Sequence, residues 1–260
     1  MNQAALVDIA KRLLGDDKGL LAMDESNATC NKRFAEVGVA QTEEARRRYR
    51  EMILTTEGLG ENISGVILYD ETIRQARSDG TTFLKLIADT GIVPGVKVDA
   101  GAKDLAVHPG EKITEGLDGL SERLQLYYAM GARFAKWRGV IGIGEDRPTD
   151  ACMGANAHAL ARYAGLRQEA GMVPIVEPEV LMDGAPPIRL ASSAGGCRAL
   201  TPVRERLRPS DFSTPAFRAQ APTRLAIKAS ITTFWICRAG GAFGIASFLR
   251  SIAQSFSRVC

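Results

Sequence analysis

Charged side chains recur two residues apart at the ends of short apolar segments in this sequence. The pairs are Lys97 with Asp99, Lys136 with Arg138, and Glu177 with Glu179, and Asp24 ends a further apolar segment. Alternate residues of a β-strand point to the same face, so each pair projects from one face of a sheet. Lysines crowded in a low-dielectric pocket lower one another's pKa, and a neutral lysine can attack a carbonyl to form a Schiff base. We therefore expect a polar site with carbonyl chemistry.

The other residue types at these positions fit the same chemistry. A carboxylate can move protons while a carbinolamine forms and loses water. An arginine and a further lysine can hold an anionic group such as phosphate. No histidine or cysteine stands at these positions, and His108 and His158 fall in a loop and on a helix. We therefore expect neither an imidazole metal site nor another cofactor.

The elements that must position these residues alternate between strands and helices. Three apolar runs follow a helix that ends at Gly91, Gly131 or Gly171, a residue suited to the left-handed conformation past a helix end. The five expected strands are 19–24, 63–70, 92–99, 132–140 and 172–180. Thr42 can cap a helix, and the expected apolar stripes are Ala45, Tyr49, Met52 and Ile53, then Leu117, Leu120, Leu124 and Tyr127, then Ala157, Leu160, Ala161 and Ala164. This alternation predicts an α/β fold with a parallel sheet.

The strand-end charges decide between two α/β architectures. A doubly wound sheet has helices on both faces and would tolerate such charges poorly. A (β/α)₈ barrel places them at its C-terminal end, where the active sites of that fold lie. We therefore expect the barrel.

Composition divides the chain in two. Residues 1–183 hold 22 basic and 28 acidic residues, for a net charge of −6, whereas residues 184–260 hold 11 basic and 2 acidic residues, for +9. With 45% hydrophobic residues, the chain can bury a core and is not a disordered protein. Five scattered cysteines do not form a disulfide scaffold, and the N-terminus lacks a secretory signal pattern. We expect a cytoplasmic protein.

The segments that carry the charges resemble those of class I fructose-1,6-bisphosphate aldolases. The resemblance covers about residues 5–184, and its most specific parts are F-A-K-W-R and V-P-I-V-E-P-E. The segments that carry the resemblance are 19–39, 63–72, 95–101, 115–124, 132–141, 155–164 and 173–184. The resemblance implies a (β/α)₈ barrel, usually a homotetramer without metal, that reversibly cleaves fructose 1,6-bisphosphate to dihydroxyacetone phosphate and glyceraldehyde 3-phosphate.

The resemblance also implies roles for individual residues. Asp24 resembles the carboxylate that orients substrate and assists carbon–carbon cleavage, and Lys136 resembles the active-site lysine that supports Schiff-base chemistry. Glu177 resembles the general acid/base, with Glu179 in a supporting electrostatic role. Contacts to substrate phosphate are implied for Lys97, Arg138 and Ser26. At Ser26 the sequence departs from the family, because Asn27 and Ala28 stand where a Thr-Gly is usual.

The tail after Gly184 does not match the family. At about 37 residues per unit, eight units need on the order of 300 residues, so we expect about five βα units in 1–184 and an irregular Arg-, Ala-, Pro- and Ser-rich tail in 185–260. We interpret the tail as translation of a shifted reading frame. The alternatives are a fusion or splice product with a basic tail and a divergent domain. Lys228, in A-I-K-A-S, is either the Schiff-base lysine or a chance match.

Two hypotheses for function remain. The first is a class I aldolase, a lyase of glycolysis and gluconeogenesis, with a sugar phosphate as its partner and no activity in the chain as written. The second is a non-catalytic aldolase fragment whose basic tail binds a membrane or a nucleic acid, or nothing. The apolar stretch 231–249 approaches the length of a membrane span, but we interpret it as a product of the unselected frame and expect neither a membrane nor a nucleic-acid partner.

Overall fold

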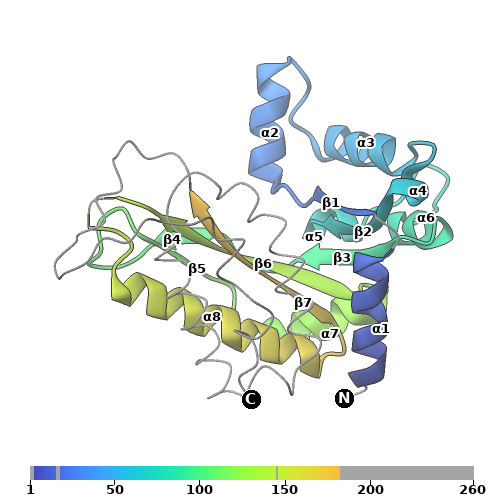
Figure 1. Cartoon of the computed structure of the whole chain (residues 1–260). Helices are drawn as coiled ribbons and strands as arrows, with labels where there is room; N and C mark the ends of the chain where they lie inside the picture. The colour runs from blue at the N-terminus through green and yellow to red at the C-terminus, as the bar shows by residue number, and fades with distance from the viewer. Residues whose placement is uncertain (1–2, 16–17, 145, 182–260) are drawn as a thin grey trace, which may run out of the picture.

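A parallel sheet of five strands organises the chain (Figure 1). The computed structural model describes residues 3–15, 18–144 and 146–181. The sheet strands are β1 (Gly19–Met23), β2 (Ile63–Leu68), β3 (Val93–Lys97), β6 (Phe134–Gly142) and β7 (Val173–Leu181). Neighbours in the sheet follow the order β1-β2-β3-β6-β7 without reversal, and every pairing is parallel. A doubly wound sheet would reverse its strand order, so the sheet is an incomplete (β/α)₈ barrel, as expected.

The remaining elements connect these strands or cover them. Eight helices are described: α1 (Gln3–Leu14), α2 (Asn27–Glu36), α3 (Glu43–Leu54), α4 (Leu59–Asn62), α5 (Asp70–Ile73), α6 (Phe83–Asp89), α7 (Leu120–Met130) and α8 (Asp150–Glu169). A two-stranded antiparallel hairpin, β4 (Ala102–Asp104) and β5 (Lys112–Thr114), separates β3 from α7. All five predicted strands are confirmed, whereas the hairpin was not predicted. The three predicted helix-ending glycines have positive φ, as at Gly91 (φ 76°).

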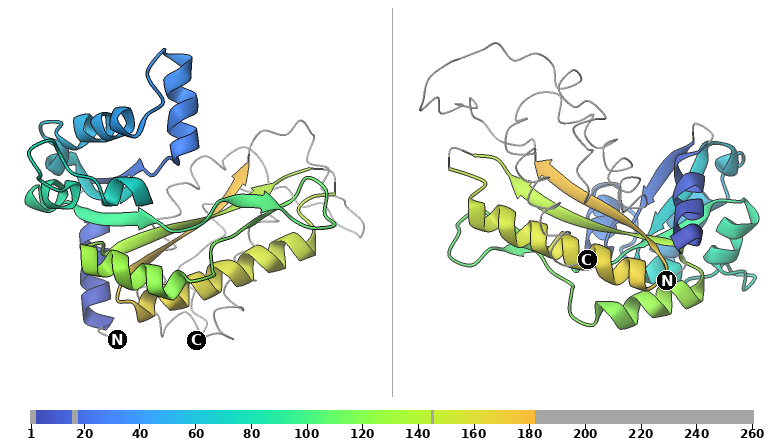
Figure 2. Two further views of the ribbon diagram at one scale, coloured as in Figure 1. Left: turned by 180° about the vertical axis from the view of Figure 1, so that it is seen from behind. Right: turned by 60° about the horizontal axis from the view of Figure 1, so that its bottom comes forward.

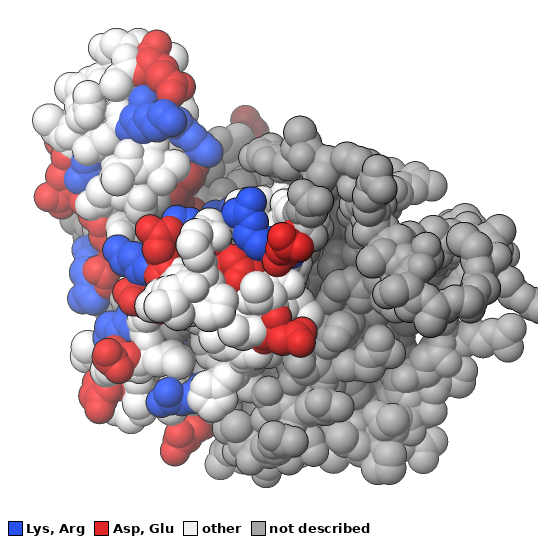
Figure 3. Space-filling model, turned by 90° about the vertical axis from the view of Figure 1, so that its left-hand side faces the viewer, with Lys and Arg blue, Asp and Glu red and all other residues white. Residues whose placement is uncertain are grey.

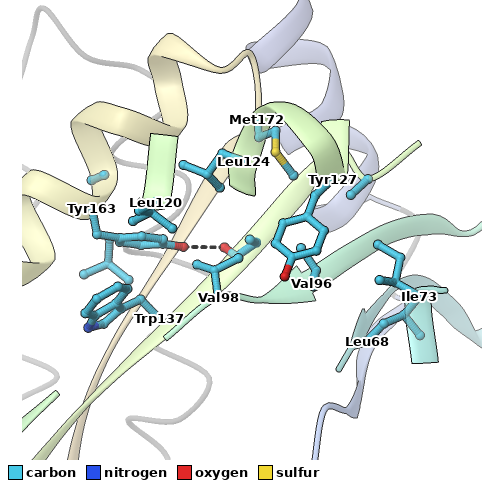
Figure 4. Close-up of a cluster of buried hydrophobic side chains, with 14 of the residues drawn as sticks. Leu68, Ile73, Val96, Val98, Leu120, Leu124, Tyr127, Trp137, Tyr163 and Met172 are labelled. Atoms are coloured by element: carbon cyan, nitrogen blue, oxygen red, sulfur yellow. Dashed lines mark hydrogen bonds between the residues drawn. The ribbon is translucent and has the colours of Figure 1, made fainter. Parts of the chain in front are cut away.

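The outer face of the sheet packs against helices α7 and α8. Most residues of the predicted stripes are buried here: Leu120, Leu124 and Tyr127 on α7, and Ala157, Leu160, Ala161 and Ala164 on α8. Leu117 precedes α7 and is partly buried against the same core. Trp137 of β6 lies on the same side, with its ring centroid 5.4 Å from that of Tyr163 (Figure 4). The Tyr163 hydroxyl donates to the Ala135 carbonyl at 2.5 Å. The apolar core therefore holds β6 in place on the outer face of the sheet.

The inner face of the sheet is closed at its N-terminal end by α1 (Figure 2). Its buried residues, Leu6, Ile9, Ala10 and Leu13, pack with a cluster that includes Phe134 of β6. Gly95 of β3 makes room for this packing, because a Cβ there would lie 2.4 Å from the Phe134 ring. The opposite, C-terminal end of the same face carries the charged residues.

Helix α3 differs from its predicted apolar stripe. Thr42 caps it as expected, by accepting from the Ala45 N–H at 3.2 Å, but Met52 is 63% exposed. The buried positions of α3 are Arg46, Arg50 and Leu54. Arg50 pairs with Glu25 at 2.5 Å and Arg46 pairs with Glu71 at 2.7 Å. The predicted stripe was wrong at Met52 only, because Ala45, Tyr49 and Ile53 are partly buried and Ile53 packs against the core. Helix α3 also packs against carboxylates near the ends of β1 and β2, which a hydrophobic pattern cannot reveal.

Acidic and basic side chains share the described surface. On the side shown in Figure 3 they are interspersed. Several are close ion pairs, such as Lys112 with Asp104 at 2.5 Å. Exposed pairs of this kind contribute little stability.

A buried carboxylate attaches the β4–β5 hairpin to the start of α8. Glu111 is 3% exposed, and it accepts from the Thr149 N–H at 2.6 Å and from the Thr149 hydroxyl at 2.5 Å. The Asn156 amide adds a bond of 2.8 Å to the Lys112 carbonyl. Burial acts to raise the pKa of Glu111, but the hydrogen bonds from Thr149 outweigh it and hold that pKa below its usual value.

Glu111→Gln is expected to lower the free energy of unfolding by about 2 kcal/mol at neutral pH, because hydrogen bonds to a charged acceptor are lost. Since the folded pKa is depressed, this stabilisation is present above the unfolded pKa of about 4.3 and is lost as pH falls through the folded value. Urea unfolding from pH 3 to 7 should therefore show wild type and variant converging below about pH 4. The exposed Glu57→Gln is the control. A difference that persists unchanged at pH 3 would contradict the prediction.

The predicted tail, Lys228 and the apolar stretch 231–249 lie outside the described residues. Within the described ranges, none of the helices has the length and hydropathy that crossing a bilayer requires.

Candidate active site

The register of the sheet brings the strand-end charges to one face. Lys97 pairs with Lys136, and Arg138 pairs with Glu177, in neighbouring parallel strands. Because side chains alternate, the residues two positions along lie on the same face. The predicted residues that this face brings to the C-terminal end of the sheet are Asp24, Lys97, Lys136, Arg138, Glu177 and Glu179.

Lys136 lies between two carboxylates at the centre of this group. Its Nζ is 3.1 Å from Asp24 Oδ2 and 3.0 Å from Glu177 Oε2. Its side chain is 10% exposed, and the two acids are nearly as buried. Three strands thus supply one buried ion triad, β6 and β7 directly and β1 through the residue that follows it.

The charge state of Lys136 differs from the expectation for crowded lysines. Burial acts to lower the pKa of its ammonium, but the charges of Asp24 and Glu177 outweigh burial and raise that pKa. The difference arises because the nearest charges to Lys136 are the two carboxylates and not a second lysine. The two carboxylates therefore favour the ammonium form of Lys136, in which the nitrogen has no free lone pair to attack a carbonyl.

Glu177 shows the opposite perturbation for an acid. Burial raises its pKa, the ammonium of Lys136 lowers it in part, and the charges of Glu179 and Asp24 raise it further, so the net shift is upward. A carboxyl group with a raised pKa can both donate and accept a proton close to neutral pH.

Two further ion pairs flank the triad. Lys97 Nζ contacts Asp99 Oδ1, and Arg138 Nε contacts Glu179 Oε2. The Arg138 side chain is 39% exposed, so part of it is accessible to a ligand. These cations could hold an anionic group beside the triad.

Ser26 lies at the start of α2, immediately after Asp24 and Glu25. Its side chain caps the helix by accepting from the Thr29 N–H at 3.3 Å, and its oxygen lies 3.0 Å from the Thr29 hydroxyl. The capping bond leaves the hydroxyl proton of Ser26 available to a ligand or to Thr29.

Sequence reasoning missed three residues at this site. Asp99 was recognised as a strand-end charge without a role, and Thr114 lies in the unpredicted hairpin. Tyr69 follows β2 in extended conformation, and its pKa is raised by burial and by the charges of Asp70, Glu71 and Asp99. Its alternation with Gly65 and Ile67 was the signal that could have placed Tyr69 on the site face.

The described residues do not assemble a metal centre. Across 3–15, 18–144 and 146–181, no three His, Cys, Asp or Glu side chains converge as metal ligands would. His108 accordingly lies in the β4–β5 loop and His158 on α8.

Comparisons with known proteins agree with this geometry. Residues 5–195 match the model of the family described as fructose-bisphosphate aldolase class-I. A probable fructose-bisphosphate aldolase class 1 from Xanthomonas campestris pv. campestris is 59% identical over 184 residues, which are 71% of this chain and 55% of that protein. Fructose-bisphosphate aldolase 3, chloroplastic, from Arabidopsis thaliana is 50% identical over 183 residues, which are 70% of this chain and 46% of that protein.

Solved structures give the same result. Fructose-bisphosphate aldolase from Plasmodium falciparum, in complex with TRAP and a small-molecule inhibitor, superposes with a TM-score of 0.68 at 44% identity. The match covers 70% of this chain and 53% of that one. The chain thus spans about half the length of the curated relatives it matches.

Proposed function

This chain belongs to the class I fructose-bisphosphate aldolase family, a family of lyases, and from that membership we propose that its strand-end site binds fructose 1,6-bisphosphate and the two triose phosphates derived from it. The observation that carries the proposal is the buried ammonium of Lys136 between Asp24 and Glu177. These are the three positions to which the resemblance assigns the chemistry.

The triad supplies charge and protons to the reacting carbons. Schiff-base formation needs a neutral amine, which adds to the carbonyl carbon and then loses the former carbonyl oxygen as water. Lys136 is charged and instead stabilises negative charge that develops near the broken carbon–carbon bond. Glu177 has the raised pKa that suits proton transfer to the departing hydroxyl. Asp24 accepts a hydrogen bond from a substrate hydroxyl and removes its proton during cleavage.

The flanking groups hold the phosphates. Lys97 and Arg138 contact one phosphate, and Glu179 orients the Arg138 guanidinium toward it. Ser26 adds a hydroxyl contact from the first turn of α2, with its oxygen shared with the helix cap. Binding by this set needs no metal ion.

The amine that attacks the carbonyl must come from beyond the described residues. Lys228 is the one lysine that follows Lys136 in the sequence, and its A-I-K-A-S context only partly resembles the family's nucleophile segment. We therefore propose that residues 1–184 are the aldolase part, that 185–260 derive from a shifted frame, and that the chain binds substrate without turning it over. Reading the nucleotide sequence after codon 184 in all three frames tests the origin of the tail.

Borohydride trapping tests the catalytic claim. Purified chain is mixed with dihydroxyacetone phosphate, reduced, and examined by mass spectrometry, and cleavage of fructose 1,6-bisphosphate is assayed in parallel. We expect no adduct and no cleavage. Lys228→Arg is the matched control, because it removes the candidate amine and keeps the charge. A stoichiometric adduct at Lys228 that this variant abolishes, together with cleavage, would establish the tail as a working part of the enzyme.

The alternative function is a non-catalytic fragment whose basic tail binds other molecules. Its support is the net charge of +9 over 184–260. Binding of sugar phosphate that survives deletion of the tail favours the first function, whereas tail-dependent binding of anionic vesicles or nucleic acid favours the second. By family membership we also propose a cytoplasmic homotetramer, which gel filtration with light scattering tests.

A further inference from the structure

The ladder between β3 and β6 stops just below the charged residues. Their register ends at Lys97 opposite Lys136, and the Val98 N–H makes the last rung, to the Lys136 carbonyl at 3.1 Å. The chain then turns away toward the hairpin, where the Ala100 N–H donates to the Glu115 carbonyl at 2.8 Å. The backbone groups of Arg138 on this side therefore lack strand partners.

Side chains replace the missing rungs. The Arg138 N–H donates to Asp99 Oδ2 at 3.2 Å, and the Arg138 carbonyl accepts from the Thr114 hydroxyl at 2.7 Å. The Arg123 guanidinium donates a hydrogen bond to the Val98 carbonyl at 3.0 Å. In a continued ladder, this carbonyl would have accepted from the Arg138 N–H. The backbone of Arg138 is thus held at its N–H by Asp99, which follows β3, and at its carbonyl by Thr114 of the hairpin.

The second oxygen of Asp99 serves the neighbouring cation. Oδ1 accepts from the Lys97 ammonium and from the Gly101 N–H at 3.1 Å. The Asp99 side chain is only 2% exposed. One buried carboxylate therefore holds the Lys97 ammonium with one oxygen and the Arg138 backbone with the other.

We propose that Asp99 is a positioning residue that sets the separation between the Lys97 ammonium and the Arg138 guanidinium, so that both meet one phosphate of a sugar bisphosphate. The inference rests on the proposed function, because it assigns these two cations to that phosphate. Asp99 itself touches no substrate. It acts by keeping two donors in place before the ligand arrives, which lowers the ordering cost of binding.

Charge and position predict opposite effects of removing this carboxylate. Taking a negative charge away from two cations should, by electrostatics alone, tighten the binding of a phosphate dianion. Loss of positioning should weaken it. Asp99→Asn separates the two, because the carboxamide keeps one acceptor but presents an N–H group where Lys97 and Gly101 also donate.

The experiment is calorimetric titration of the full chain with glucitol 1,6-bisphosphate, which has no carbonyl group and cannot react. We expect Asp99→Asn to raise Kd about tenfold, roughly one 1.4 kcal/mol step. Asp104→Asn removes the same charge from an 84% exposed side chain and should leave Kd unchanged. If Asp99→Asn and the wild-type chain unfold at the same temperature, binding by Asp99→Asn that is as tight as or tighter than that of the wild type would overturn the proposal.

Two further measurements keep the outcome clear. Thr114→Val removes the hydrogen bond to the Arg138 carbonyl without changing any charge, and it should weaken binding about threefold. Unchanged binding in Thr114→Val would contradict the proposal, even if Asp99→Asn does not fold. Hydrogen exchange at the Arg138 amide needs no ligand and should be at least tenfold faster in Asp99→Ala. Failure of the wild-type chain to bind glucitol 1,6-bisphosphate would refute the proposed function, whereas unchanged exchange would refute the role of Asp99.

Discussion

Replacing Lys136 by methionine is expected to lower the free energy of unfolding by about 3 kcal/mol, because removal of one partner strands the buried charge of the other. Here two carboxylates, Asp24 and Glu177, would face each other without their shared ammonium. The raised pKa of Lys136 means that its stabilisation is present below its unfolded pKa of about 10.4 and is lost only as pH rises through the folded value. The effect should therefore appear throughout the neutral range.

Urea unfolding followed by circular dichroism measures this loss. Lys85→Met is the matched control, because Lys85 pairs with Asp89 at 2.8 Å on the surface of α6 and should cost less than about 1 kcal/mol. The double variant Lys136→Met/Glu177→Gln should recover part of the loss by removing one of the two stranded charges. A single variant that loses no more than the Lys85 control would show that the triad is hydrated or open in solution.

Replacing Arg167 by methionine is expected to raise the free energy of unfolding by about 2 kcal/mol, because burying a guanidinium without a counter-ion is costly. Arg167 on α8 is fully buried, and among the described residues it forms no ion pair. Its Nη atoms donate to the Tyr163 hydroxyl at 3.1 Å and to the Val173 carbonyl at 2.9 Å, whereas its Nε has no partner in the part of the chain that the structure describes. Burial accordingly lowers the pKa of the guanidinium.

Methionine suits this position because its flexible side chain fills irregular apolar space. The Tyr163 hydroxyl would keep its bond to the Ala135 carbonyl. Arg162→Met, one exposed turn away on the same helix, is the control and should change stability by less than about 0.5 kcal/mol. A loss of stability in Arg167→Met would show that the two donated hydrogen bonds outweigh the cost of burying the charge.

The sequence by itself determined the strands, their order and the charges at their ends. Apolar runs such as 63–70 and 172–180 predict strands, because Val- and Ile-rich segments between turn residues favour that conformation locally. Spacing of two residues then placed Lys136 with Arg138, and Glu177 with Glu179, on common faces. The change in net charge between 1–183 and 184–260 could likewise be counted from composition alone, because it needs no knowledge of neighbours in the fold.

Only the tertiary structure decided which groups meet. Periodicity assigns a side chain to a face but not to a partner on another strand, so the position of Lys136 between Asp24 and Glu177 followed from the register of four parallel pairings. That position raises the pKa of the lysine, since the two nearest charges are negative. Neighbours distant in the chain likewise determine the burial of Arg50 on α3 and the hydrogen bond from the Arg138 N–H to Asp99. Burial and electrostatics are properties of the assembled neighbourhood, which no local pattern of residues contains.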